Sequence, residues 1–151
     1  MNSLRVAGAI DLGGHTLTIE SGGLIMGGSS AIHNGTIVPG ESSAGELVIH
    51  GNLVSNALLS SIADAPGHKA TLVLNNLSSG VLTTSNTYSG ATIINGGRVI
   101  VTRSDALPHG TDLDLNLATS NNGGNGRVLS ASMPDLISQG RYRQSWPARA
   151  A

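Results

Sequence analysis

The sequence predicts an all-β fold, a right-handed parallel β-helix (β-solenoid) segment of about five coils with an irregular C-terminal tail. Three observations predict it. The 151 residues include 21 Gly, two Tyr, one Trp and no Phe, and only 11% of them are charged. Short apolar runs recur as far as residue 117, and nearly every gap between them holds Gly, Asn, Ser or Pro. The 3.6-residue periods of amphipathic helices are missing, and strands this short must stack to bury enough surface.

The expected strands follow the apolar runs in chain order. They span residues 9–12, 16–19, 24–26, 36–38, 47–49, 53–54, 71–74, 81–83, 92–94, 99–101 and 113–117. A solenoid period of about 20 to 25 residues places residues 6–117 in about five coils. One coil buries only about two or three Val, Ile or Leu side chains, at about 1.5 to 3 kcal/mol each. Because ordering costs about 1 to 2 kcal/mol per residue, we expect neighbouring coils to be required for stability.

The organising stretch runs from residue 81 to residue 116, with its centre at residues 86–101. Thr92 and Ile94 share one side of the first run, and Val99 and Val101 share one side of the second, so we expect all four to face the core. Asn95-Gly96 between them allows two structures. It can close an antiparallel hairpin, or it can form the corner of a coil whose strands pair with neighbouring coils. The hairpin alternative corresponds to an antiparallel β-sandwich or roll.

A family resemblance covers the same stretch. Residues 86–101, NTYSGATIINGGRVIV, and residues 105–111, DALPHGT, resemble the autotransporter-associated β-strand repeat, N-T-Y-S-G-x-T-x-I-N-x-G-x-L-x-V followed by A-L-G-x-G-T. Ile93, Arg98 and Pro108 depart from that pattern. The repeat core spans residues 81–116, and the upstream segment fits the same style, so the resemblance extends over about residues 6–117.

The resemblance implies a fold and a location. Such repeats build parallel β-helical passenger regions of surface or secreted proteins, which implies a cell-surface or secreted location for this chain. It also implies neighbouring β-helix coils of a longer parent chain as partners, with surface glycans or proteins as further partners.

The two ends of the chain differ from the middle. Residues 118–126 are rich in Ser, Asn and Gly and indicate a flexible link, and the strand pattern is lost from Arg127. We therefore divide the chain into a β-helical repeat region, 1–117, and a segment 118–151 that consists of the flexible link and a poorly ordered tail, 127–151. The apolar run 6–10 is too short for a signal-peptide core, and no stretch could span a bilayer as a helix. The chain as given is thus expected to lack its own export signal, and the surface-protein resemblance then implies a fragment of a longer product, a mis-assigned start or a decayed gene.

Several classes of function are excluded or disfavoured. A net charge of −1 gives no electrostatic reason to expect nucleic acid, which would favour a clustered basic face. Zero Cys excludes disulfides, thiolate metal sites and Cys nucleophiles. The glycines at 22–28 lack the Gly-Lys-Ser/Thr ending of a phosphate-binding loop, and the order of residues 107–111 differs from a sortase signal.

Two sets of residues are candidate binding or catalytic sites. The first set is the five histidines, of which the first four are almost evenly spaced along the chain, and they are His15, His33, His50, His68 and His109. Such spacing could stack imidazoles into a metal ladder. Because these histidines lie at different corners relative to the strands, solvated turn residues are the favoured interpretation.

The second set is acidic. Asp11, Asp112 and Asp114 are placed on predicted strands, and Asp112 and Asp114 lie two apart on one face. With Arg98 and Arg103 as candidate basic partners by proximity only, such acids could bind Ca²⁺ or perform acid–base chemistry. Solvated outward carboxylates are favoured over either role. Tyr88, the aromatic residue of the repeat, is expected to cover a coil corner with its hydroxyl in water. We therefore predict no catalytic, cofactor-binding or metal-binding residue and no cofactor.

The function predicted from these features is structural. The chain is expected to be a non-catalytic structural or adhesive segment of a bacterial autotransporter-like surface or secreted protein, serving as a stalk or display scaffold. The alternative is a polysaccharide-active enzyme or glycan-binding module on a β-helix. The scarcity of aromatic residues that could stack on sugars counts against it.

Overall fold

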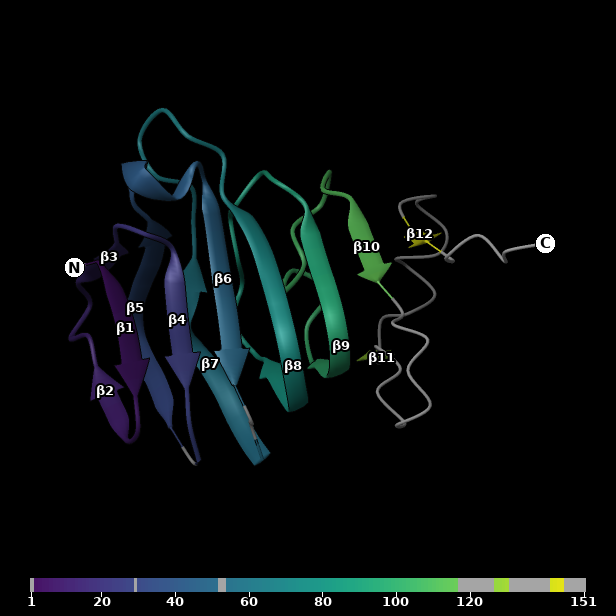
Figure 1. Ribbon diagram of the computed structural model, residues 1–151, viewed down its shortest axis with the longest axis horizontal. Coiled ribbons are helices and arrows are strands. Elements are labelled where there is room, and N and C mark those ends of the chain that lie inside the picture. Colours follow the sequence, from purple (N-terminus) through teal and green to yellow (C-terminus); the bar gives the residue numbers. More distant parts are fainter. Residues whose placement is uncertain (1, 29, 52–53, 117–126, 131–141, 146–151) are drawn as a thin grey trace.

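A computed structural model describes residues 2–28, 30–51, 54–116, 127–130 and 142–145, and it shows a parallel β-solenoid (Figure 1). The described residues form twelve strands and one 3-10 helix, η1. Their bounds are β1 Ser3–Val6, β2 Ala9–Asp11, β3 Thr16–Ile19, β4 Gly23–Met26, β5 Ala31–Pro39, η1 Glu41–Ser43, β6 Glu46–Gly51, β7 Val54–Ile62, β8 Thr71–Leu82, β9 Thr92–Val101, β10 Leu113–Asn116, β11 Arg127–Ser130 and β12 Tyr142–Ser145.

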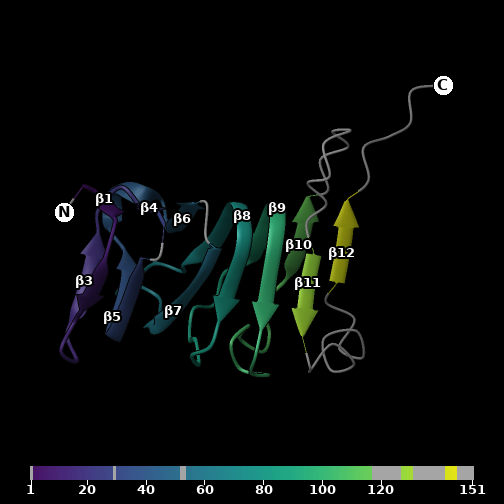
Figure 2. The ribbon, with the colours of Figure 1, turned by 90° about the horizontal axis from the view of Figure 1, so that it is seen from below.

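The strands form three sheets around the solenoid axis, and every named pair of strands is parallel. Sheet 1 contains β1, β4, β6, the first halves of β8 and β9, then β10 and β12. Sheet 2 contains β2, the first half of β5, β7, the second halves of β8 and β9, then β11, and Figure 2 shows this sheet in front. Sheet 3 contains β3 and the ends of β5 and β7.

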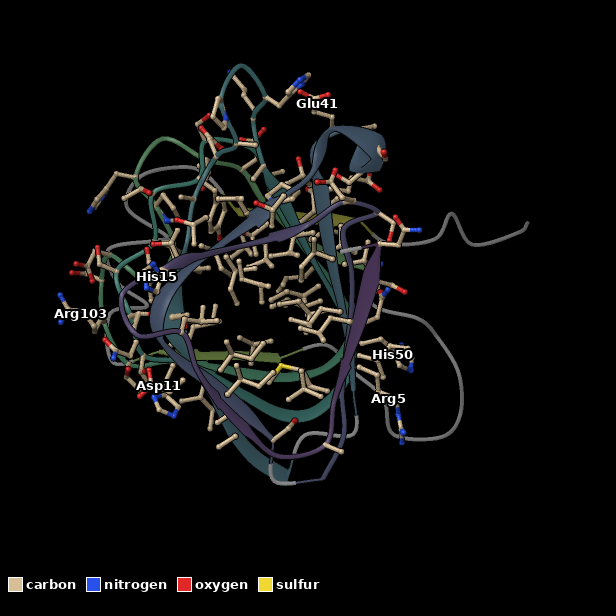
Figure 3. The ribbon with its side chains drawn as sticks, turned by 90° about the vertical axis from the view of Figure 1, so that its left-hand side faces the viewer. Arg5, Asp11, His15, Glu41, His50 and Arg103 are labelled. Carbon is tan, nitrogen blue, oxygen red and sulfur yellow. The ribbon has the colours of Figure 1, made fainter. Side chains whose placement is uncertain are left out.

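The solenoid is right-handed, as predicted. Figure 3 looks from the N-terminal end, and the chain passes from Arg5 through Asp11, His15 and Glu41 to His50 in a clockwise direction while it recedes. A clockwise, receding path defines a right-handed coil, which is the hand that parallel crossovers adopt.

The total length of each of the first three coils is set at the corner between sheets 3 and 1, because differences at the other two corners cancel. The path from sheet 1 to sheet 3 has the same length in each, and it joins the equivalent positions Ser3 and Leu17, Gly23 and Ile37, and Val48 and Ile62. The return to sheet 1 is short from Leu17 to Gly23, whereas it is longer from Ile37 to Val48 and from Ile62 to Val73. The differences in coil length therefore lie at the corner between sheets 3 and 1. We call it the 3-to-1 corner, and it comprises residues 18–22, 38–47 and 63–72.

Each predicted strand overlaps an observed one, but the strand pattern is more continuous than predicted. The runs 92–94 and 99–101 belong to the single strand β9, in which Asn95 pairs in parallel with Asn75 and Asn116. The Asn-Gly pair is therefore a coil corner, and the antiparallel hairpin and the sandwich or roll built on it are wrong.

Two regions contain strands that the apolar runs did not indicate. β1 and most of β7 were missed because their polar residues interrupt the apolar pattern. In the predicted tail, β11 extends sheet 2 by pairing with β9, and β12 extends sheet 1 by pairing with β10. The remaining residues of that tail lie outside the described part of the chain, so the boundary at residue 117 stays a prediction.

The core is made of buried side chains stacked in columns along the axis, and side chains fill the interior in Figure 3. One column of sheet 1 contains Leu24, Ile49, Leu74, Ile94 and Leu115, each from a successive coil. The predicted inward positions are confirmed, since Thr92, Ile94, Val99 and Val101 are at most 2% exposed. Stacking of like positions gives Ile49, Leu74 and Ile94 an apolar neighbour in the coil on each side.

Among the glycines of the 3-to-1 corner, Gly22 has the least room for a side chain. Its φ is +69°, and a Cβ atom there would overlap the carbonyl oxygen of Glu46 in the next coil. We expect Gly22→Ala to destabilise the fold by about 2 to 4 kcal/mol, measured by urea denaturation, because left-handed strain and overlap with rigid backbone add together.

Two other glycines separate these contributions. Gly14 has a φ of +84° but nothing within 4 Å of an added Cβ, so Gly14→Ala reports strain alone. Gly8 has open space and no positive φ, so Gly8→Ala should change stability by less than about 0.5 kcal/mol. Equal losses for Gly22→Ala and Gly14→Ala would contradict the role of the overlap.

Candidate functional site

Asp11 joins the first two coils at the corner between sheets 2 and 3. Its Oδ1 accepts hydrogen bonds from the backbone N–H of Gly13 at 2.8 Å and from Nδ2 of Asn34 at 3.0 Å, and its Oδ2 lies 3.9 Å from Nδ1 of His33. The hydrogen bonds from Gly13 and Asn34 lower the pKa of this carboxyl group. Asp11 is therefore a bonded corner residue rather than a free carboxylate.

The other predicted acids do not gather with the predicted basic residues. Asp112 precedes β10 instead of lying on it, which corrects the expectation that it shares a strand face with Asp114. Asp114 lies in β10 between the buried Leu113 and Leu115 and so faces outward. Arg103 binds Asp105 instead, through Nε–Oδ1 at 2.8 Å and Nη2–Oδ2 at 2.9 Å, while the side chain of Arg98 lies outside the described residues.

This Arg103–Asp105 pair is a local clamp at the surface. The arginine holds the pKa of the Asp105 carboxyl well below its usual range, through its hydrogen bonds more than through its charge. Both side chains are well exposed, so the pair orders the loop after β9 and contributes little to stability.

The histidines do not form a column, because the strand register separates them. His33 in β5 is in register with Asp11 and Leu59, and His50 in β6 is in register with Ile25 and Asn75. His15, His68 and His109 lie in turns or loops, as favoured from the sequence for these three. Within the described residues, no group of three or more His, Asp or Glu side chains could hold a metal ion.

Asn86 makes the most buried polar link between coils, and sequence reasoning missed it. Its Oδ1 accepts from the backbone N–H of Ile62 at 2.7 Å, and its Nδ2 donates to the carbonyl oxygen of Ala106 at 2.6 Å. One side chain, 5% exposed, thus joins the coil before it to the coil after it. In these coils loops occupy the position of sheet 3, and the Asn86 side chain links them by hydrogen bonds in place of strand pairing. The available signal in the sequence was Asn86 itself, the first residue of the repeat pattern.

Tyr88, two residues after Asn86, is buried, which corrects the expectation that its hydroxyl reaches water. It is 1% exposed, and its hydroxyl is 2.6 Å from Oγ1 of Thr92, itself buried. Burial raises the pKa of Tyr88 far above the ordinary value for a phenol. The ring therefore fills the core next to β9, and the two hydroxyls satisfy each other.

Asp64 closes the loop that follows β7 at the 3-to-1 corner. Its Oδ1 accepts from the N–H groups of Ala70 at 2.7 Å and Ser89 at 2.9 Å, and its Oδ2 accepts from Oγ of Ser89 at 2.7 Å. Burial raises the pKa of Asp64, but these hydrogen bonds and the charge of Lys69 outweigh it, so the pKa lies below its ordinary value. The ionised carboxylate thus fastens this loop to the following coil.

This link predicts a pH dependence of stability. Because the pKa of Asp64 is lower in the folded chain, its contribution is present above the ordinary pKa near 4 and is lost as the pH falls through the folded value. We expect the stability advantage of the wild type over Asp64→Asn, measured by urea denaturation, to be full at pH 6 and to shrink below pH 4. Glu41→Gln, at an exposed residue of η1, is the control. An advantage that stays constant down to pH 2 would contradict the link.

The 3-to-1 corner projects two segments from the solenoid, η1 and the loop after β7 (Figure 1). Ser43 fastens η1 by donating from its backbone N and its Oγ to the carbonyl oxygen of Gly40. In the loop, His68 N donates to the carbonyl oxygen of Ala65 at 3.0 Å, and Gly67 has a φ of +80°, as in a type II turn. These hydrogen bonds hold the backbone of both segments, which expose the side chains of Glu41, Pro66, His68 and Lys69.

The comparisons with known proteins identify no relative. No known family matches the chain, and no curated protein or solved structure matches it significantly. No helix in the part that the structure describes is long and apolar enough to cross a membrane. The side chains of Asp11, Asp64 and Asn86 thus form hydrogen bonds between neighbouring coils.

Proposed function

We propose that this chain is a non-catalytic structural or adhesive segment of a bacterial cell-surface or secreted protein, serving as a stalk or display scaffold. The observation that supports it is the succession of side-chain links that join one coil to the next along the solenoid. Hydrogen bonds join Asp11 to Asn34 and Asp64 to Ser89, and others join Asn86 to both Ile62 and Ala106. Together with parallel strand pairing, these links resist separation of the coils.

The display role is inferred from the position of the segments whose length differs between coils. The path from sheet 1 to sheet 3 keeps one length in the first three coils, and the extra residues of η1 and the loop 63–70 lie on one corner. Parallel strands lie about 4.8 Å apart, so these two segments stand side by side on adjacent coils. A rigid body with its variable segments on one edge is suited to presenting them to a partner.

Force spectroscopy on the full chain, held at both ends, tests the stalk role. We expect abrupt extensions, each corresponding to the release of one coil of about 20 to 25 residues, as between Ser3, Gly23 and Val48 in sheet 1. At about 3.3 to 3.6 Å per residue each release should lengthen the chain by about 7 to 9 nm. Smooth extension without such steps would contradict a mechanical role.

Two further assays separate adhesion from the enzymatic alternative. Beads carrying the full chain should adhere to glycan- or protein-coated surfaces less after replacement of residues 65–69 by Gly and Ser, whereas Thr16→Ser on sheet 3 should leave adhesion unchanged. If neither variant changes adhesion, display by this corner is contradicted. Ca²⁺-dependent loss of viscosity of a polysaccharide solution would instead favour the enzyme.

A further inference from the structure

Asn-Gly pairs occur four times in the chain, at residues 34–35, 95–96, 122–123 and 125–126, and the structure describes the first two. Asparagine before glycine is prone to deamidation, because the nitrogen of a residue without a side chain can easily approach the asparagine amide carbon. At the first pair, a Cβ atom on Gly35 would overlap Cβ of Leu12 and the carbonyl oxygen of His15. The fold therefore requires a chemically labile pair at the corner between sheets 2 and 3.

The first coil holds this pair by hydrogen bonds to both side chain and main chain. Nδ2 of Asn34 donates to Oδ1 of Asp11 at 3.0 Å, and the carbonyl oxygen of Asn34 accepts from the backbone N–H of Gly14 at 2.6 Å. After the pair, the backbone N–H of Thr36 donates to the carbonyl oxygen of His15 at 3.1 Å. Asp11 and His15 lie at this corner in Figure 3. All three partners belong to the end of β2 or to the turn that follows it.

This hydrogen-bonded conformation keeps the reacting atoms of the pair apart. The φ of Asn34 is +58°, in the left-handed region, where ψ is about +30 to +60°. In that region the nitrogen of the next residue points away from Cβ, so the nitrogen of Gly35 is not placed to attack Cγ of Asn34. Ring closure requires rotation about the Cα–C bond of Asn34, which turns its carbonyl oxygen away from Gly14. The pair can therefore react only after the first coil has opened at this corner.

The second described pair, Asn95-Gly96, lies between two coils. Asn95 pairs in parallel with Asn75 on one side and with Asn116 on the other. β2 and β3, by contrast, pair with β5 alone among the described strands. A strand with a neighbour on one side opens more readily than a strand between two neighbours, so Asn34 should become reactive before Asn95.

We propose that Asn34 is a deamidation site that reacts only when the first coil opens, and that its conversion makes this opening irreversible. The backbone nitrogen of Gly35 loses its proton and bonds to Cγ of Asn34, the Cγ–Nδ2 bond breaks, and Nδ2 leaves as ammonia. Water then opens the succinimide ring, either at Cγ to give aspartate or at the main-chain carbonyl carbon to give isoaspartate. Solvent water is the only co-reactant.

The product does not fit the closed corner. The Nδ2 donor of Asn34 is replaced by a carboxylate oxygen facing Oδ1 of Asp11, so a hydrogen bond becomes a repulsion between two negative charges. Isoaspartate also adds one carbon atom to the main chain, at a corner where Gly35 is packed closely against Leu12. The converted chain therefore loses the contacts that closed the corner, and the first coil stays loosened.

Peptide mapping by mass spectrometry tests the site. The full chain is incubated at about 37 °C and about pH 8, and the rate at each Asn-Gly pair is divided by the rate of the same pair in guanidinium chloride. We expect folding to slow the conversion of Asn34 by about tenfold or more, and to slow that of Asn95 further still. Equal rates at Asn34 in the folded and unfolded chains, or weaker protection of Asn95 than of Asn34, overturn the proposal.

Substitution of Asp11 tests the restraint. Asp11→Ala removes the acceptor of Asn34 Nδ2 and should speed the conversion of Asn34 by about tenfold, while the rate at Asn95 stays unchanged. Asp112→Ala removes an exposed carboxylate next to β10 and should change neither rate. Circular dichroism melting checks that both variants fold. If Asp11→Ala leaves the rate at Asn34 unchanged, or speeds both pairs equally, the first coil does not control the reaction.

Amide exchange tests the irreversible release. The Gly14 amide, which donates to Asn34, should lose protection in the converted chain, and Asn34→Asp should show the same loss without incubation. The Val48 amide, which donates to the carbonyl oxygen of Gly22 between later coils, should keep its protection in both. If the Gly14 amide stays protected after conversion, the modification does not release the first coil.

Discussion

Ile94→Asp is expected to abolish the folded state of the chain. Ile94 is fully buried in the column between Leu74 and Leu115, and its aspartate would have no partner of opposite charge there. Burial of an unpaired carboxylate costs more than about 5 kcal/mol, as much as the whole stability of many domains. Far-UV circular dichroism should show loss of the β spectrum, and amide exchange should lose its protection.

The adjacent residue provides a matched control. Ile93 has the same side chain in the same strand, but it faces outward and is partly exposed. Ile93→Asp should therefore keep the β spectrum and lose at most about 1 kcal/mol of stability. An unchanged melting profile for Ile94→Asp, or equal damage from both variants, would reject the inward assignment of Ile94.

Asn86→Leu should produce the second-largest loss, about 2 to 5 kcal/mol. Leucine has a similar size but cannot pair with the N–H of Ile62 or the carbonyl oxygen of Ala106, and each buried group left without a partner costs about 1 to 3 kcal/mol. Urea denaturation measures the total loss. Native-state exchange should show that the Ile62 amide proton loses protection more than those of neighbouring coils.

The exposed asparagine pair of sheet 1 provides the comparison. Asn95 donates to Oδ1 of Asn75 at 2.9 Å in an exposed position, so Asn95→Ala should cost less than about 1 kcal/mol. If Asn86→Leu costs no more than Asn95→Ala, or if the Ile62 amide stays protected, then Asn86 does not hold the coils together.

The sequence predicted the path of the chain better than its polar links. Alternation places Thr92, Ile94, Val99 and Val101 in the core because it depends only on the two-residue period of a strand. The corner at Asn95 could not be distinguished from a hairpin, since Asn-Gly suits both, and its strand partners, Asn75 and Asn116, lie in the coils before and after it.

The polar links depend on residues that only coiling brings together. Nothing local to Asn86 indicates that Ile62 and Ala106 will lie on either side of it. Tyr88 was predicted to contact water because tyrosine usually lies at surfaces, and its actual partner, Thr92, was already expected inside the core. The repeat resemblance that includes both residues stays a prediction.

The constant path from sheet 1 to sheet 3 has a consequence for protein engineering. Natural differences in length are accommodated between Ile37 and Val48 and between Ile62 and Val73, while strand register on both sides is kept. Loop-closure entropy rises only slowly with length, by about 0.6 kcal/mol for each doubling. Foreign peptides grafted between Ala65 and His68 would therefore be carried at a known height on a stiff body, and copies of the scaffold could be built with its epitopes on neighbouring coils.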